Sequence, residues 1–170
     1  NGSAYVTWHA WPIMYEKNYG RGIFTSSVSG ILGSFGQSNY GAAKMGMVGL
    51  MNNLSREGAG HNIHTNCLSP GAATRMTASV PGSSIDAENP DKGNRPGLVS
   101  PVILHLASEE APNGRIIQAA RGRYASDAMY ANTGVDLGED ATEQDFLDNI
   151  DDILDMSDAS LKTKFWRSRK

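Results

Sequence analysis

The chain of 170 residues has a single cysteine, Cys67, and four histidines, none of them at the spacing of a metal site. One thiol cannot build an internal disulfide framework or a cysteine-rich metal centre. The sequence therefore predicts no bound metal. No apolar run approaches the ~20 residues that a membrane-spanning helix needs, so we expect no membrane span.

A concentrated basic face is also missing. Residues 1–135 carry 10 basic and 8 acidic groups, which excludes the electrostatic footprint of a nucleic-acid-binding protein. Residues 136–158 carry 10 acidic groups and no Lys or Arg, whereas residues 159–170 carry five basic groups. This pattern predicts two parts, a body over residues 1–135 and an acidic helix with a basic tail over residues 136–170.

The body alternates between helix and strand patterns. Hydrophobic residues make up 39% of the chain, enough for a sizeable core. Glycine and proline mark the breaks, as at Gly58, Gly60 and Pro70. The expected elements are helix 4–17, a turn at 19–21, strand 22–26, helix 38–58, strand 62–68, helix 100–108 and strand 114–120. Strands separated by helices predict an α/β fold with a mostly parallel sheet.

The acidic part restarts a helical pattern. Thr142 precedes Asp145 by three residues, as at the capped start of a helix. Apolar residues from Phe146 to Leu154 then recur at helical spacing, with aspartates opposite. We interpret the acids as a solvated face, and a cover over the substrate cleft or a neighbouring subunit is the alternative. The basic end, residues 162–170, is interpreted as solvated, with a phosphate-bearing substrate as its alternative contact.

Three residues of the body form a constellation that can carry out proton chemistry. Tyr40 and Lys44 are four residues apart in an expected helix, so both face the same way. A phenol is a weak acid at neutral pH, and a neighbouring ammonium favours its ionised form. Such a pair can move a proton to or from a substrate oxygen. Ser27 ends a strand 13 residues earlier and can hydrogen-bond the same oxygen.

The stretches of sequence around these residues are more specific to a protein family than the spacing of the three residues. They are GRGIFTSS at 20–27, GQSNYGAAK at 36–44 and NIHTNCLSPG at 62–71. Over residues 1–120 the chain resembles the short-chain dehydrogenase/reductase family. Within that family it is most similar to the D-3-hydroxyacyl-CoA dehydrogenase unit of peroxisomal multifunctional β-oxidation enzymes and their bacterial relatives. The resemblance implies the C-terminal part of a Rossmann-type, doubly wound parallel sheet.

The resemblance also implies a role for each matching residue. Tyr40 matches the family's proton donor and acceptor, and Lys44 matches the lysine that assists it and holds the nicotinamide ribose. Substrate contacts are expected at Ser27, Gln37 and Tyr40. Besides Tyr40 and Lys44, the residues expected to contact NAD or NADP are Pro70, Gly71, Ala73 and Thr74. The implied reaction is hydride transfer between nicotinamide and a secondary alcohol or ketone.

Two features of the family are not in this sequence. One is the glycine-rich phosphate loop after the first strand, together with the acidic or basic residue that selects NAD or NADP. The other is the catalytic asparagine, which would fall just before Asn1. We therefore expect that about 100 residues of a ~250-residue domain are missing. The first strand present would then have an unpaired edge.

The expected function is oxidoreduction of a 3-hydroxyacyl thioester, with an acyl-CoA as the small-molecule partner. The alternatives are a truncated, non-catalytic interaction module, or the same chemistry on a steroid or another carbonyl substrate. A homo-oligomer through helices 3–18 and 38–58 is expected. Gly41, Gly46 and Gly49 in the latter helix either pack internally or serve that interface. We expect a cytoplasmic location, with the peroxisome as the alternative, although the chain lacks a terminal Ser-Lys-Leu.

Overall fold

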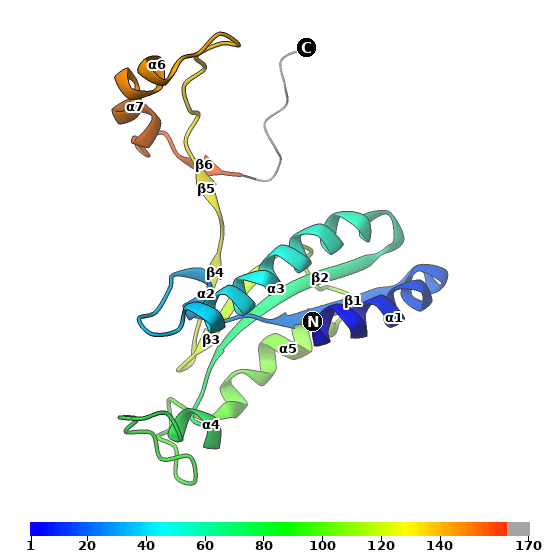
Figure 1. Ribbon diagram of the computed structural model, residues 1–170. Coiled ribbons are helices and arrows are strands. Elements are labelled where there is room, and N and C mark those ends of the chain that lie inside the picture. The colour runs from blue at the N-terminus through cyan, green and yellow to red at the C-terminus, as the bar shows by residue number, and fades with distance from the viewer. Residues whose placement is uncertain (163–170) are drawn as a thin grey trace. The chain divides into compact units, whose positions relative to one another are not determined.

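The computed structural model of the chain describes residues 1–162 and builds its main sheet from four strands (Figure 1). In sheet order these are β1 (Gly20–Thr25), β2 (Ile63–Gly71), β3 (Ile116–Ala120) and β4 (Arg123–Asp127). The first three strands pair in parallel, and β4 returns antiparallel to β3. The expected α/β sheet is confirmed. Its parallel strands bring the carboxyl ends of β1 and β2 to one edge, where ligands bind in such folds.

Helices cover both faces of this sheet. The long ones are α1 (Gly2–Lys17), α3 (Ser38–Glu57) and α5 (Ser100–Ala107). Successive side chains of β2 point to opposite faces. The Thr65 hydroxyl donates to the Met51 carbonyl oxygen of α3 at 3.1 Å, whereas Leu68 packs in a cluster with Val99 at the start of α5. This is the doubly wound arrangement that the family resemblance implies.

The larger core cluster lies between α3 and the sheet. It contains Phe24, Val48, Met51, Leu54, Cys67 and Ile116, all buried. In the sequence, Ala43, Met47, Leu50 and Leu54 recur along one face of the 38–58 helix, which predicts that this face packs inward. Only Leu54 is fully confirmed, while Met47 and Leu50 are partly buried at the margin. The buried residues Val48, Met51 and Leu54 lie on a face rotated from the one expected. Apolar side chains occur on several sides of α3, so the sequence pattern does not identify the side that packs inward.

Several large apolar side chains of helix α1 are exposed to solvent. Tyr5, Val6 and Trp8 are all more than 60% exposed, and no residue of α1 is buried. A groove of about 590 Å³ runs between α1, α3 and β1. Within the described chain β1 pairs only with β2, so the expected free strand edge is present along this groove.

Short elements that we did not expect fill the connections. They are α2 (Val28–Ile31), a 3₁₀ turn η1 (Ala59–His61), α4 (Arg75–Ala78) and a 3₁₀ turn η2 (Pro96–Leu98). The prediction of a turn at 19–21 is wrong, because β1 already begins at Gly20, which pairs with Ile63. The β3–β4 hairpin was also missed. Its tip is Arg121-Gly122, with φ of 54° and 72°, as a two-residue hairpin turn requires.

A second compact unit begins at Ala128, after the first unit of Asn1–Asp127. It contains β5 (Tyr130–Ala131), α6 (Glu143–Asp148), α7 (Ile150–Leu154) and β6 (Ser160–Leu161). The expected cap is confirmed, since Thr142 and Asp145 form a capping box at α6. The expected single helix is broken at Asn149 into two. The basic end lies outside the described residues from 163 onward. In residues 1–162 no helix is long and apolar enough to cross a membrane.

Candidate active site

Two glycines let the short helix α2, which follows β1, lie against the first turns of α3. A Cβ atom on Gly30 would stand 2.8 Å from the Cβ of Lys44, and one on Gly41 would stand 2.9 Å from the Ser29 carbonyl oxygen. No ordinary side chain fits at such distances. The short helix α2 is thereby held directly against α3. Gly46 and Gly49 have nothing within 4 Å of a Cβ, so among the three glycines of α3 only Gly41 packs internally.

Tyr40 and Lys44 come together as their spacing predicts. The Lys44 Nζ lies 5.6 Å from the centroid of the Tyr40 ring and donates to the Thr25 carbonyl oxygen at 3.1 Å. The Ser26 hydroxyl fixes the same turn by donating to the Lys44 carbonyl oxygen at 2.9 Å. An ammonium has three donors, so the bond to Thr25 leaves donors for a ligand. Tyr40 is 42% exposed, so its ring is open to solvent.

Ser27 lies two residues after Thr25, whose carbonyl oxygen accepts the hydrogen bond from Lys44. Its Oγ accepts the backbone N–H of Ser29 at 3.2 Å and caps α2. Within residues 1–162 no hydrogen bond joins the Ser27 hydroxyl to Tyr40 or Lys44. A hydroxyl that accepts one bond still has its own proton to donate. Ser27 therefore caps α2 just after the strand that Lys44 contacts, and its own hydroxyl proton makes no hydrogen bond among the described residues.

Two buried polar atoms at this edge have no hydrogen-bond partner among the described residues. They are the Oε1 of Gln37, directly before α3, and the Oγ of Ser69, near the end of β2. An unpaired buried acceptor or donor is costly and calls for a partner from outside the chain. Gln37 was expected as a substrate contact. Ser69 was missed, although a small polar residue directly before Pro70-Gly71 was the available signal.

The loop of residues 70–74 leaves the sheet at the same edge. Gly71 is pressed against β3, because a Cβ there would lie 2.8 Å from that of Ala120. Ala73 is 3% exposed, and its N–H donates to the Asn94 carbonyl oxygen at 2.8 Å. Thr74 caps α4, and its Oγ1 accepts the N–H of Thr77 at 3.2 Å. The Thr74 hydroxyl is thus already bonded within the chain.

A cavity of about 670 Å³ opens beside this loop. Its walls come from Gly71 and Ala73, from the 81–97 segment through Asp86 and Asn94, and from Arg121 at the hairpin tip. In residues 1–162 no three His, Cys, Asp or Glu side chains gather as metal ligands. The site is instead a phenol, an ammonium, hydroxyls and a polar cavity, arranged along the carboxyl edge of the sheet.

Comparison with known proteins bears on this arrangement. Residues 1–83, which contain α1, β1, α3 and β2, match the family model described as short chain dehydrogenase. This segment belongs to the short-chain dehydrogenase/reductase family. It includes Ser27, Tyr40, Lys44 and the 70–74 loop.

The similarity to relatives extends over both units of the chain. A short-chain type dehydrogenase/reductase of Mycobacterium tuberculosis is 39% identical over 162 residues, covering 94% of this chain and 54% of the relative. The peroxisomal multifunctional enzyme type 2 of Mus musculus is 38% identical over 164 residues, covering 94% of this chain and 22% of that enzyme. The chain therefore spans about half or less of the length of these relatives.

A solved structure shows the same likeness in three dimensions. The full-length peroxisomal multifunctional enzyme type 2 of Drosophila melanogaster matches with a TM-score of 0.77 and 36% identity, covering 94% of this chain and 29% of that one. The expected Rossmann-type fold and the resemblance to the peroxisomal multifunctional enzymes are both confirmed.

Proposed function

We propose that the protein carrying this chain transfers hydride between NAD or NADP and a secondary alcohol or ketone, and that its substrate is a 3-hydroxyacyl thioester such as an acyl-CoA. The observation that carries the proposal is the Tyr40–Lys44 pair, with the Lys44 ammonium 5.6 Å from the phenol ring and bonded to Thr25 beside Ser27. Relatives named as acetoacetyl-CoA reductases support an acyl-CoA as the substrate.

The residues of the chain divide the work of the reaction. The Tyr40 hydroxyl gives a proton to the substrate oxygen in reduction and takes it back in oxidation. The Lys44 ammonium lies 5.6 Å from the centroid of the ring that makes this exchange. The Ser27 hydroxyl, which keeps its proton while capping α2, donates to the same substrate oxygen and orients it. Gln37, with its buried unpaired Oε1, contacts the substrate from the start of α3.

The cofactor supplies or accepts the hydride when it is bound. The residues present fit such a group, because Lys44 retains donors for ribose hydroxyls and Ser69 has an unpaired buried hydroxyl at the strand end. The residues proposed to hold it are Tyr40, Lys44, Pro70, Gly71, Ala73 and Thr74. Since the Thr74 hydroxyl is bonded to Thr77, we propose that Thr74 contacts the cofactor through its remaining atoms.

The test replaces Tyr40 with phenylalanine in the complete protein. We expect kcat/KM for a 3-hydroxyacyl-CoA to fall by about 100-fold or more, because the proton-transfer group is removed. Tyr19→Phe is the matched control, since Tyr19 has nearly the same exposure, 40% against 42%, and lies outside the site. Activity of Tyr40→Phe within a few-fold of the parent would disprove the role. Absence of nicotinamide binding by the parent would favour the non-catalytic alternative, and activity only on a steroid would change the substrate.

We also propose that α1 and α3 form the interface of a homo-oligomer. The exposed aromatic side of α1 and the open surface at Gly46 and Gly49 support this, because such apolar area is normally covered by a partner. Trp8→Glu should lower the molar mass measured by light scattering, whereas Leu32→Glu, at an equally exposed leucine beyond α2, should not. Unchanged mass in both variants would refute this interface.

The compartment is part of the proposal. We propose that the protein acts in the cytoplasm. The peroxisome is the alternative, because the Mus musculus relative is named as peroxisomal. Localisation of the complete protein with a fluorescent tag distinguishes the two.

A further inference from the structure

The 81–97 segment has almost no regular structure, yet it forms a wall of the cavity. Aspartate turns give it shape. Asp86 Oδ1 accepts the N–H groups of Glu88 at 2.9 Å and Asn89 at 3.0 Å. Asp91 Oδ1 accepts the N–H of Gly93 at 2.8 Å. Such side-chain turns replace backbone hydrogen bonds in a loop. The two aspartates therefore do the same local work five residues apart.

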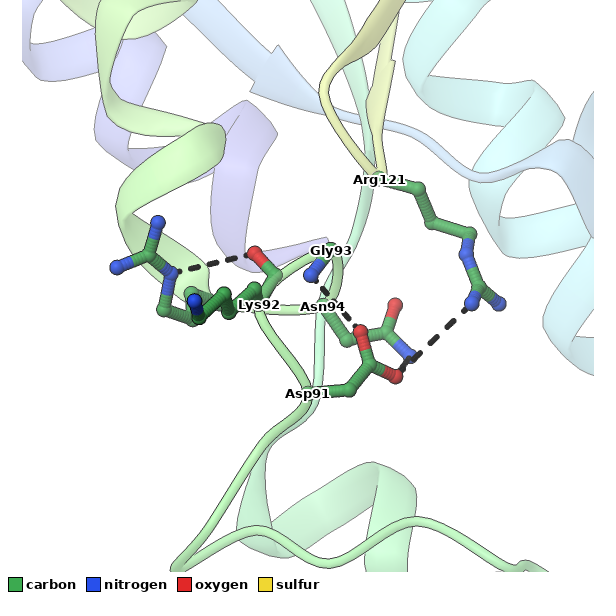
Figure 2. Close-up of polar contacts among 6 residues, drawn as sticks. Asp91, Lys92, Gly93, Asn94 and Arg121 are labelled. Carbon is green, nitrogen blue, oxygen red and sulfur yellow. Dashed lines mark hydrogen bonds and ion pairs between the residues drawn. The ribbon is translucent and has the colours of Figure 1, made fainter.

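Asp86 Oδ2 also accepts the side-chain Nδ2 of Asn89, at 3.5 Å. Asp91 makes a shorter bond of this kind and lies near Arg121 as well. Figure 2 shows its carboxylate between Gly93, Asn94 and Arg121. The second oxygen, Oδ2, accepts the Asn94 Nδ2 at 3.2 Å and lies 3.9 Å from Arg121 Nη2. The Asp91 carbonyl oxygen also accepts the Asn94 N–H at 2.9 Å. Two bonds from Asp91 thus fix the position of Asn94, and a third holds the neighbouring Gly93.

Asn94 in turn holds the 70–74 loop. Its carbonyl oxygen accepts the N–H of Ala73 at 2.8 Å. Ala73 is 3% exposed, and a buried N–H must keep its partner or incur a large cost. Beyond Ala73 the loop is held by the cap of α4 at Thr74. The path from the Asp91 carboxylate to Ala73 therefore passes through one residue, Asn94.

Arg121 contributes less to this arrangement. Its ion pair with Asp91 is long, and the two side chains are 68% and 60% exposed, so solvent screens the attraction. The pair joins the hairpin tip to the 81–97 segment without fixing it. The hydrogen bonds to Gly93 and Asn94 are the contacts that hold the turn.

We propose that Asp91 is a positioning residue for cofactor binding, acting through Asn94 to hold the 70–74 loop in place. The inference rests on the proposed function, in which that loop contacts NAD or NADP. In this proposal Asp91 acts through its bonds to Asn94 and not through a bond to the cofactor. Its loss should therefore weaken the binding of the cofactor and leave the proton transfer at Tyr40 intact.

The test measures the dissociation constants of NADH and NADPH by fluorescence in the complete protein. Asp91→Ala should weaken binding of the preferred nucleotide by about ten-fold, the scale of one lost hydrogen bond. The KM for the cofactor should rise by a similar factor while kcat at saturation stays within about two-fold. Asp91→Asn keeps an oxygen for the Gly93 N–H, so most of the affinity should return. Asp155→Ala is the matched control, because Asp155 forms a similar side-chain turn with Ser157 and does not line the cavity, and it should change the affinity less than two-fold. Asp86→Ala, in the same segment as Asp91, measures general loosening of that segment.

The outcomes separate the inference from the function on which it rests. A parent protein that binds neither nucleotide defeats the proposed function. A parent that binds, with Asp91→Ala and Asp86→Ala weakened equally, shows general loosening of the segment and overturns the role of Asp91. Unchanged affinity in Asp91→Ala overturns it too. Because Asp91 is exposed, its variants should melt within a few degrees of the parent.

Discussion

The two units of the molecule differ in how many of their side chains are buried. In the first, Asn1–Asp127, side chains such as Met51, Ile63 and Leu106 are almost completely withdrawn from water. In the second, no residue from Ala128 to Lys162 is buried, and Leu154 on α7 is 67% exposed. Both units were expected from apolar residues at helical spacing. The spacing gives the helix, but burial also requires a second apolar surface facing it.

Hydrogen bonds from side chain to backbone take the place of a core in the second unit. Asn132 Nδ2 donates to the carbonyl oxygens of Ile153 at 2.9 Å and Asp155 at 2.7 Å. The Thr133 N–H donates to the Asp158 carboxylate, at 3.2 Å for the nearer oxygen. These bonds tie α7 to the strand that precedes it. The unit is therefore expected to open at lower free energy than the first one.

The largest difference should come from the same substitution in each unit. Leu106→Ala leaves a cavity in the first unit, and we expect it to lower the free energy of unfolding by about 2–5 kcal/mol. Leu154→Ala removes an exposed side chain and should change that quantity by less than about 0.5 kcal/mol. Urea unfolding of the complete protein measures both. Equal losses would show that α7 is covered by a surface belonging to another part of the assembly.

A smaller effect is expected from removing a side chain that forms hydrogen bonds within the second unit. Asn132→Ala loses both hydrogen bonds to the end of α7, at about 1–3 kcal/mol in total. Faster amide exchange in α7, with unchanged exchange in α3, is the expected result. Asn53→Ala is the control in the first unit, because the Asn53 side chain makes one exposed bond to the Gly49 carbonyl oxygen. Equal effects in both units would contradict the comparison.

The smallest effect concerns acidity at the start of α6. Hydrogen bonds from the Thr142 hydroxyl and N–H hold the pKa of Asp145 below its ordinary value of 3.8. A lowered pKa in the folded state means that this capping box stabilises α6 above pH 3.8 and is lost as the pH falls further. The Thr142 amide resonance should shift in that range, and Asp145→Asn should abolish the shift. A resonance that titrates unchanged in Asp145→Asn would point to another acid.

The elements of the first unit could be predicted where glycine and proline mark their ends. The helix that ends before Gly58 follows from such a residue. The expected end of the strand at Pro70-Gly71 is wrong, because β2 continues through both residues, which pair with Ala119 and Ala120. The hairpin into β4 could not be predicted, since its tip places Arg121 at positive φ where Asn or Gly is usual. The inward face of α3 was also beyond the sequence, because apolar residues continue round that helix.

The site divides in the same way. Tyr40 and Lys44 lie on one helix, and their four-residue spacing alone places them together. Ser69 and Asp91 could not be found so directly. The unpaired hydroxyl of Ser69 appears only once the strands are packed, and the link from Asp91 to Ala73 crosses a segment without periodicity. Local spacing predicts local geometry, whereas contacts between distant segments need the fold.

The lone thiol of the core offers a way to time the opening of the sheet. Cys67 is completely buried on β2, its Sγ lies 3.5 Å from the Met47 carbonyl oxygen, and burial raises its pKa to about 12. It is the only cysteine in the chain, so every reaction with a thiol reagent reports this one position. A protonated, shielded thiol does not react at neutral pH. Modification of Cys67 in native buffer therefore requires α3 to separate from the sheet, and its rate reports on that opening.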